Sequence, residues 1–338
     1  MEVNNHWFEV VERNMGKIFP EIRIGEALAH SGLAVYPLYT NSKTEVDYQV
    51  AVAALESGDV SVEEVDQEGT VPHLLVTNAG DSQVFFMEGE ELTGGKQNRA
   101  VNTSVLAGSK TSLRIPVSCV EAGRWGYEGS PDGPQGGGVK SELSSELNCF
   151  SPEVRKSLRD SVSVSLRKQR GHTSSQGEIW DEIKKEQDDL GVKSPSKAMK
   201  DTYDSYREKL DEFKARLKYP GRAVGLVGTI DGQVVSFDLF DKASTCESFW
   251  ERLVSSFAMS RLKRRSRLTV DVRRQDQEGR LEAPDIEKFV EMANAAQWRP
   301  YDAVGEGVEY RVRTEDGMEG FALHYDGKLV HGSLLAAK

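Results

Sequence analysis

Between Ile22 and Trp125 the sequence is a succession of short segments rich in β-branched and aromatic residues. Among them are LAVYPLY, HLLVTN, QVFFME and SLRIPVSCVE, separated by the turn-forming runs NAGD, GG and AGS. Segments of this length with turn signals between them favour β-strands. The stretch, roughly 100 residues long, is sufficient for a sandwich or a barrel-like core.

A glycine- and proline-rich segment then interrupts the pattern. The run GYEGSPDGPQGGG, residues 126–138, disfavours regular structure and indicates a connector, with a substrate-gating lid as the alternative. Beyond it, residues 151–217 show helical periodicity. In the last predicted helix, an apolar seam repeats at spacings of three and four and should pack on another helix or on a partner subunit. Its residues are Tyr203, Tyr206, Leu210, Phe213 and Leu217.

Two hairpins in the last third of the chain resemble each other. Aligning Gly225 with Gly320, a shift of 95 residues (320 − 225), also aligns the turn Asp231-Gly232 with Asp326-Gly327. Asp-Gly is a favoured dipeptide for tight primed turns. The pattern indicates either a duplicated strand pair that shares one sheet, or two hairpins that converged on the same turn chemistry.

Together these patterns predict an α+β fold with a β-rich, sandwich or barrel-like part, a helical insert and a second strand-helix-strand part. The predicted divisions are a β-rich part with a leading helix (residues 1–125), a Gly/Pro-rich loop (126–140), the helical insert (141–220) and an α+β part (221–338). We expect the last part to pack with the first as one unit.

Charge and cysteine content exclude several classes of protein. The formal net charge of −11 disfavours a dedicated nucleic-acid binder, because phosphate binding usually requires an excess of basic residues. The three cysteines form no CxxC pair, which disfavours a disulfide framework or a zinc ribbon and favours a reducing compartment. The start MEVNNHWFEVVERN resembles no signal peptide, and no apolar run has the length of a membrane span. We therefore expect a cytoplasmic protein without a membrane partner.

The stretch EGEELTGGKQNR, residues 88–99, concentrates charge directly after an apolar run. It is not a P-loop, because Gly95 separates Gly94 from Lys96 and Gln97 stands at the hydroxyl position. The paired glycines and the cations still allow an anion site. If QVFFMEGEEL is one strand, two of its carboxylates, Glu88 and Glu90, lie on one face about 7 Å apart. Such a pair can bind a cation or divide acid and base roles. Alternatively, these acids pair with Lys96 and Arg99.

A second polar cluster is IPVSCVEAGRW, residues 115–125. Strand alternation places Cys119 on the apolar face, which favours a buried cysteine. The alternative is that Cys119 is a nucleophile, which Arg124 allows, together with Glu121 and Trp125 at the end of the strand. We expect the two clusters to be neighbouring strands or turns that face one cavity.

Four runs resemble one known family. They are VPHLLVTNAGDSQVFFMEGEELTGGKQNRAVNTSVL, IPVSCVEAGRW, QGEIWDEI and VVSFDLFDKASTCESFWERLVSSFAMS. The chain resembles the proteins associated with ADP-ribosylglycohydrolases and rhodanese-phosphatases, over roughly residues 20–335. The resemblance implies an association with ADP-ribose or NAD-derived metabolism, and it supplies no catalytic residues.

We therefore expect a protein that binds or processes an ADP-ribose- or NAD-derived, or another small anionic, metabolite. The alternative is a non-catalytic oligomeric scaffold or interaction module, with the tyrosine seam at a homo-oligomer interface. The sequence identifies neither a cofactor nor a metal. The candidate catalytic residues are Glu88, Glu90, Glu91, Cys119 and Glu121, and the candidate ligand-binding residues are Gly94, Gly95, Lys96, Gln97, Asn98, Arg99, Arg124 and Trp125.

Overall fold

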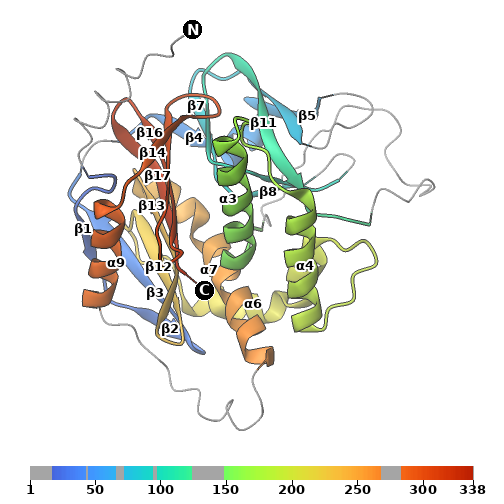
Figure 1. The fold of residues 1–338 in the computed structure, drawn as a ribbon, viewed down its shortest axis with the longest axis vertical. Helices are drawn as coiled ribbons and strands as arrows, with labels where there is room; N and C mark the ends of the chain where they lie inside the picture. Colours follow the sequence, from blue (N-terminus) through green and yellow to red (C-terminus); the bar gives the residue numbers. More distant parts are fainter. Residues whose placement is uncertain are drawn as a thin grey trace.

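The computed structural model describes most of the 338-residue chain (Figure 1). The described residues are 17–42, 45–65, 72–93, 97–123, 148–267 and 283–337. The expected leading helix and the expected Gly/Pro-rich loop, residues 126–140, lie outside them.

The fold is α+β, built on a curled half-barrel sheet of antiparallel strands. This sheet joins strands from the beginning of the chain to strands from its last third (Figure 1). In spatial order the described strands are β1 (Ile22–Ile24), β3 (Leu33–Thr40), β12 (Gly225–Ile230), β13 (Gln233–Phe240), β17 (Lys328–Leu335), β16 (Glu319–Tyr325), β15 (Val308–Arg313) and β14 (Arg299–Asp302), with β2 (Leu28–His30) paired to β3.

The other strands of the β-rich part form two smaller sheets beside the main one. The first contains, in order, β10 (Val105–Ala107), β7 (Gln83–Phe86) and β4 (Tyr48–Val50). The second contains β5 (Val60–Glu64), β6 (His73–Asn78), β11 (Thr111–Cys119), β9 (Arg99–Val101) and β8 (Glu91–Leu92). They share a core of β-branched and aromatic side chains with the short helix α2 (Ala51–Glu56).

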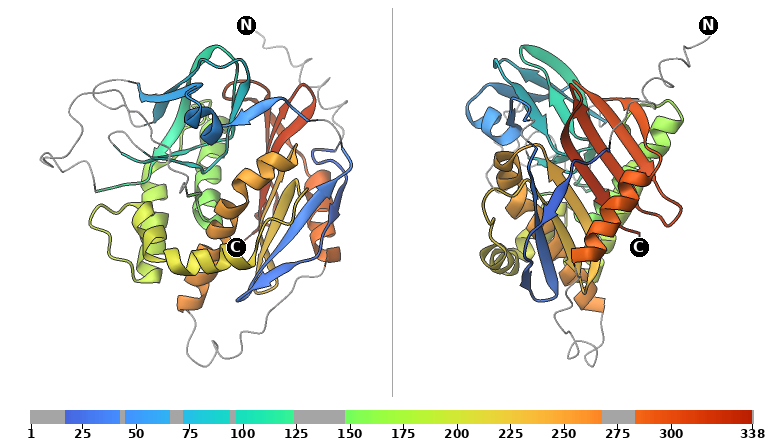
Figure 2. Two further views of the ribbon diagram at one scale, coloured as in Figure 1. Left: turned by 180° about the vertical axis from the view of Figure 1, so that it is seen from behind. Right: turned by 90° about the vertical axis from the view of Figure 1, so that its left-hand side faces the viewer.

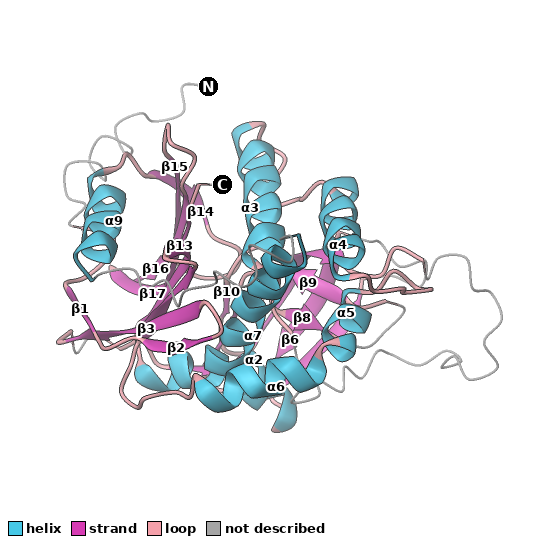
Figure 3. Ribbon diagram, turned by 90° about the horizontal axis from the view of Figure 1, so that it is seen from below, coloured by secondary structure: helices cyan, strands magenta, loops and turns pink. Residues whose placement is uncertain are grey.

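Helices cover both faces of the main sheet (Figures 2 and 3). The long α7 (Ala243–Arg267) packs on one face and α9 (Ala283–Ala295) on the other. Adjacent residues of β12 therefore enter different cores: Leu226 lies in the core on the α7 side, and Val227 lies in the core on the α9 side. This alternation is the expected consequence of a strand buried on both sides. The remaining helices, α3 (Pro152–Arg167), α4 (Gln176–Leu190), α5 (Met199–Ser205) and α6 (Arg207–Arg216), lie on the α7 side.

The predicted apolar seam is confirmed. Tyr203, Leu210, Phe213 and Leu217 are buried in the α7-side core, and Tyr206 packs against it. The seam is shared by two helices rather than one, because Tyr206 leaves the helical region with φ −112° and ψ 10°. Because the seam is buried within the chain itself, it is not available as a subunit interface.

The two similar hairpins form a repeat within the main sheet. Both turns have positive φ at each Asp-Gly position, as a type I′ turn requires. Both hairpins have a register shift at matching places, after Gly228 and after Leu323, again 95 residues apart (323 − 228). Strands β13 and β17 pair with Asp238 opposite Ser333, whose numbers differ by the same 95 (333 − 238). A local twofold axis therefore passes between these two residues, and the register favours duplication over convergence.

Candidate functional site

The two motif segments are neighbouring strands, as expected. Strand β9 pairs antiparallel with the end of β11, and Arg99 lies opposite Cys119. On its other side β9 pairs with β8, so that Glu91 lies opposite Ala100. The backbone thus brings both clusters of polar residues to one place.

The expectation of a single strand through QVFFMEGEEL is wrong. Strand β7 ends at Phe86, and the chain turns at Gly89, whose φ of 79° suits a residue without Cβ, before β8 begins. The two carboxylates therefore have separate partners. Glu90 pairs with Arg252 of α7 at 2.7 Å, whereas Glu88 contacts two arginines of α3. Arg99 pairs with neither.

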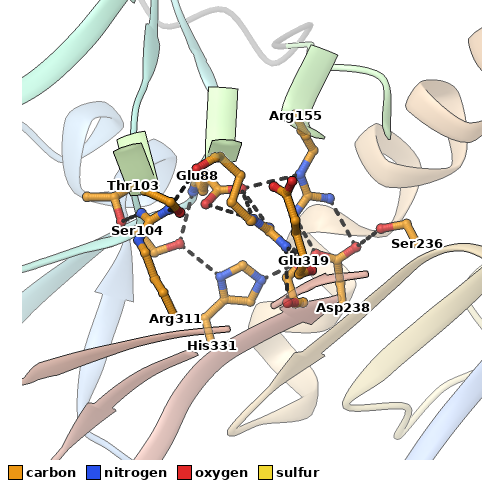
Figure 4. A network of polar contacts seen from close by, with 12 residues as sticks. Glu88, Thr103, Ser104, Arg155, Ser236, Asp238, Arg311, Glu319 and His331 are labelled. Atoms are coloured by element: carbon orange, nitrogen blue, oxygen red, sulfur yellow. Dashed lines mark hydrogen bonds and ion pairs between the residues drawn. The ribbon is translucent and has the colours of Figure 1, made fainter. Parts of the chain in front are cut away.

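Glu88 belongs to a buried network between α3 and the main sheet (Figure 4). Arg159 Nη2 donates to Glu88 Oε1 at 2.6 Å, and Arg155 lies between Glu88 and Asp238, donating to Asp238 at 2.7 Å. Both arginines also donate to the hydroxyl of Ser333. The network therefore ties α3 to the two strands on the local twofold axis. The sequence signal was the spacing of four between the two arginines on one helix, which places them on the same face.

The network also holds a serine, a histidine and an aspartate in the order of a hydrolase triad. Ser104 Oγ lies 2.8 Å from Nδ1 of His331, whose Nε2 lies 3.4 Å from Asp238 Oδ1. Ser104 also accepts the backbone N–H of Glu88. All three side chains are fully buried, and burial lowers the pKa of His331. Because the hydroxyl is enclosed and Arg155 binds the aspartate, we interpret this group as structural.

A second polar cluster lies where the motif segments meet, and Asn98 bridges its two carboxylates. The Asn98 backbone N–H donates to Glu121 Oε2 at 2.8 Å, and its side-chain amide donates to Glu91 Oε1 at 3.2 Å. Asn148 donates to the other oxygen of Glu91. Burial raises the pKa of Glu91 to about 7, although the two amide hydrogen bonds lower it, and the charge of Glu121 adds to the increase. This cluster is hereafter the Asn98 bridge.

Cys119 lies beside the bridge as a buried thiol. Its Sγ is 3.0 Å from Gln97 Oε1, which also accepts a hydrogen bond from Arg99 at 2.6 Å. Burial raises the pKa of the Cys119 thiol, although Arg99 opposes the shift, so the protonated form dominates at neutral pH. Arg99 Nε and Oε2 of the nearby Glu64 have no hydrogen-bond partner among the described residues.

The third motif, QGEIWDEI, fixes the end of β11. The Gln176 side chain accepts the backbone N–H of Cys119 and donates to its carbonyl, both at 2.8 Å. Trp180 Nε1 donates to the same carbonyl at 3.1 Å. A side-chain amide thus takes the place of a neighbouring strand, and it holds α4 against the Asn98 bridge.

Five predicted ligand-binding residues lie outside the described part of the chain: Gly94, Gly95, Lys96, Arg124 and Trp125. Within residues 17–337, excluding the undescribed gaps, no three metal-ligating side chains gather into a site. The described helices include none that is long and apolar enough to cross a membrane.

Comparisons with known proteins agree with the resemblance seen in the sequence. The family described as ARG and Rhodanese-Phosphatase-superfamily-associated Protein domain matches residues 21–335. No curated protein and no solved structure matches the chain.

Proposed function

This chain belongs to the ARG and Rhodanese-Phosphatase-superfamily-associated Protein family, and we propose that it binds and processes a small anionic metabolite at the Asn98 bridge. The observation that carries the proposal is the bridge itself, in which one asparagine holds Glu91 and Glu121 together at the meeting point of two motif segments. The ligand class we favour is ADP-ribose and NAD-derived compounds, which the family description suggests.

The two carboxylates suit acid–base chemistry. A group whose pKa lies near the working pH can both donate and accept a proton, and burial brings the pKa of Glu91 to about 7. Glu121 accepts the backbone N–H of Asn98 at 2.8 Å, which holds its carboxyl group beside Glu91. We assign Glu91 as the general acid or base and Glu121 as the second carboxyl group of the site.

Arg99 follows Asn98 directly in the sequence and begins strand β9. Its Nη1 donates to Gln97 Oε1 at 2.6 Å and its Nη2 lies 3.7 Å from Glu64 Oε1. Its Nε has no hydrogen-bond partner among the described residues, so it retains a donor for a ligand oxygen. Lys96 and Arg124 remain predicted anion ligands, since their side chains lie outside the described part of the chain. A planar arginine fork is well suited to a phosphate.

The first candidates Glu88 and Glu90 receive a structural role in this proposal. Each is fully buried and paired with arginine, and removing a charge from such a pair leaves the other uncompensated. This enclosure is also what favours the second candidate function, a non-catalytic scaffold in which the polar groups only hold the layers together.

Titration calorimetry with ADP-ribose and with NAD tests the proposal. The wild type should show saturable binding of at least one of them, and Arg99→Lys, which keeps the charge but loses the fork, should weaken it by about tenfold or more. Arg216→Lys, at an exposed position of α6, is the matched control and should bind as the wild type does.

Conversion of the bound compound, followed by chromatography, separates binding from processing. Glu91→Gln should retain binding and lose conversion. If the wild type binds neither compound, or if Arg99→Lys and Arg216→Lys bind equally well, the scaffold function replaces this proposal.

A further inference from the structure

A cavity of about 260 Å³ lies beside α3, away from the Asn98 bridge. It is bounded by one face of α3, the connection between α3 and α4, and the first turn of α4. Its lining is almost entirely polar, and Val164 is its one aliphatic side chain. The lining residues are Asp160, Ser161, Val164, Ser165, Lys168, Arg170, Thr173, Ser174, Ser175 and Glu178.

Charge in this cavity favours an anion. Lys168 and Arg170 are exposed, and neither forms an ion pair with any described residue. The acid on the α3 side, Asp160, is already paired with Arg313 of β15. Glu178 is therefore the one carboxylate of the lining that is not in an ion pair within the described structure, against two cations.

The two helix ends at the cavity differ in the backbone hydrogen-bonding groups that they leave available. In the last turn of α3 the carbonyls of Val164, Ser165 and Leu166 accept the backbone N–H groups of Lys168, Gln169 and Arg170. At the start of α4 the side chain of Ser175 forms no capping hydrogen bond, and the N–H groups of a first helical turn have no partner within the helix. The cavity therefore meets donors rather than acceptors, in addition to its two cations.

We infer that this cavity is a second anion site, which takes the phosphate group of a small molecule. Lys168 and Arg170 supply charge, and the Ser175 hydroxyl and the N–H groups of the first turn of α4 supply hydrogen bonds to the phosphate oxygens. A water molecule occupies about 30 Å³ of liquid. The volume therefore has room for a phosphate together with a small organic body.

The cavity is separate from the Asn98 bridge. None of the residues that line the cavity belongs to the Asn98 bridge, which consists of Glu91, Asn98, Glu121 and Asn148. The cavity approaches β11 where Ser174 contacts Ser118 at 2.5 Å. Phosphate binding here does not depend on the proposed function, and either one can fail alone.

Titration of the chain of residues 1–338 with inorganic phosphate, monitored by ³¹P NMR and by calorimetry, tests the inference. The wild type should show saturable one-to-one binding. Lys168→Gln and Arg170→Gln should each weaken it by about fivefold or more, and the double variant should abolish it. Lys193→Gln removes an equally exposed charge elsewhere and should leave binding unchanged.

Both positions are exposed, so these variants should fold as the wild type does, which circular dichroism verifies. Glu121→Gln should bind phosphate normally, because it alters only the other site. Absence of saturable binding by the wild type overturns the inference. It is equally overturned if Lys193→Gln weakens binding as much as Lys168→Gln does, since the effect is then that of net charge alone.

Discussion

Arg155 donates to Asp238 at 2.7 Å where both side chains are fully buried, and this contact joins helix α3 to the strand at the centre of the main sheet. Burial alone would raise the pKa of Asp238, but the charge of Arg155 holds it well below its usual range. The pair therefore keeps its charges in the interior.

Arg155→Met should reduce the free energy of unfolding by about 3 to 5 kcal/mol, because Asp238 is left as a buried charge without its main partner. Urea denaturation measures the change. Arg207→Met is the control, since it breaks an exposed ion pair with Asp204 at 2.7 Å and should cost less than about 1 kcal/mol. Equal losses in the two variants would mean that the buried pair contributes no more than a surface pair.

Gln176→Ala should destabilise the protein by about 1 to 3 kcal/mol and expose the end of β11 to exchange. The variant leaves the buried N–H of Cys119 without its acceptor, while Trp180 still donates to the carbonyl. Hydrogen exchange at the Cys119 amide is the most specific readout. Lys184→Ala, exposed on the same helix, should change neither quantity. Unchanged protection of the Cys119 amide in Gln176→Ala would contradict the role assigned to Gln176 at the end of β11.

His324 should make the protein sensitive to mild acid. Burial lowers its pKa from 6.5 to about 4, so the unfolded chain takes up a proton at a higher pH than the folded chain does. This contribution to stability is complete above pH 6.5 and is lost as the pH falls toward 4. His324→Gln should therefore lose less stability between pH 7 and pH 4, by up to about 3 kcal/mol, in urea unfolding at both pH values. Parallel pH profiles for the two proteins would contradict this.

Local patterns were predictable from the sequence. The seam from Tyr203 to Leu217 follows from helical periodicity, and the Asp-Gly turns of both hairpins follow from the positive φ that such turns require. The neighbouring positions of β9 and β11 were also expected, because both segments place polar residues at the ends of apolar strands.

Partners far apart in the chain were not predictable. Glu88 is matched with Arg159, 71 residues away, and the sequence offered the nearer Lys96 and Arg99 with equal chemical plausibility. Likewise, nothing local shows that β3 joins β12 in the main sheet while β4 to β11 form separate sheets. Tertiary packing decides these pairings. The prediction that alternate residues of QVFFMEGEEL share a face was wrong because the chain turns at Gly89, and a turn changes which residues share a face.

We assign Glu91 as a proton-exchanging group held at the Asn98 bridge. A ¹³C NMR titration of the glutamate side-chain carboxyls, with Glu91→Gln for assignment, measures it directly. We predict one resonance that titrates near pH 7 and is absent from the variant, because burial raises the pKa of Glu91 to about 7. Addition of ADP-ribose or NAD should move this titration. A Glu91 resonance that titrates near pH 4.5, the ordinary value for glutamate, and that does not respond to either compound would contradict this assignment.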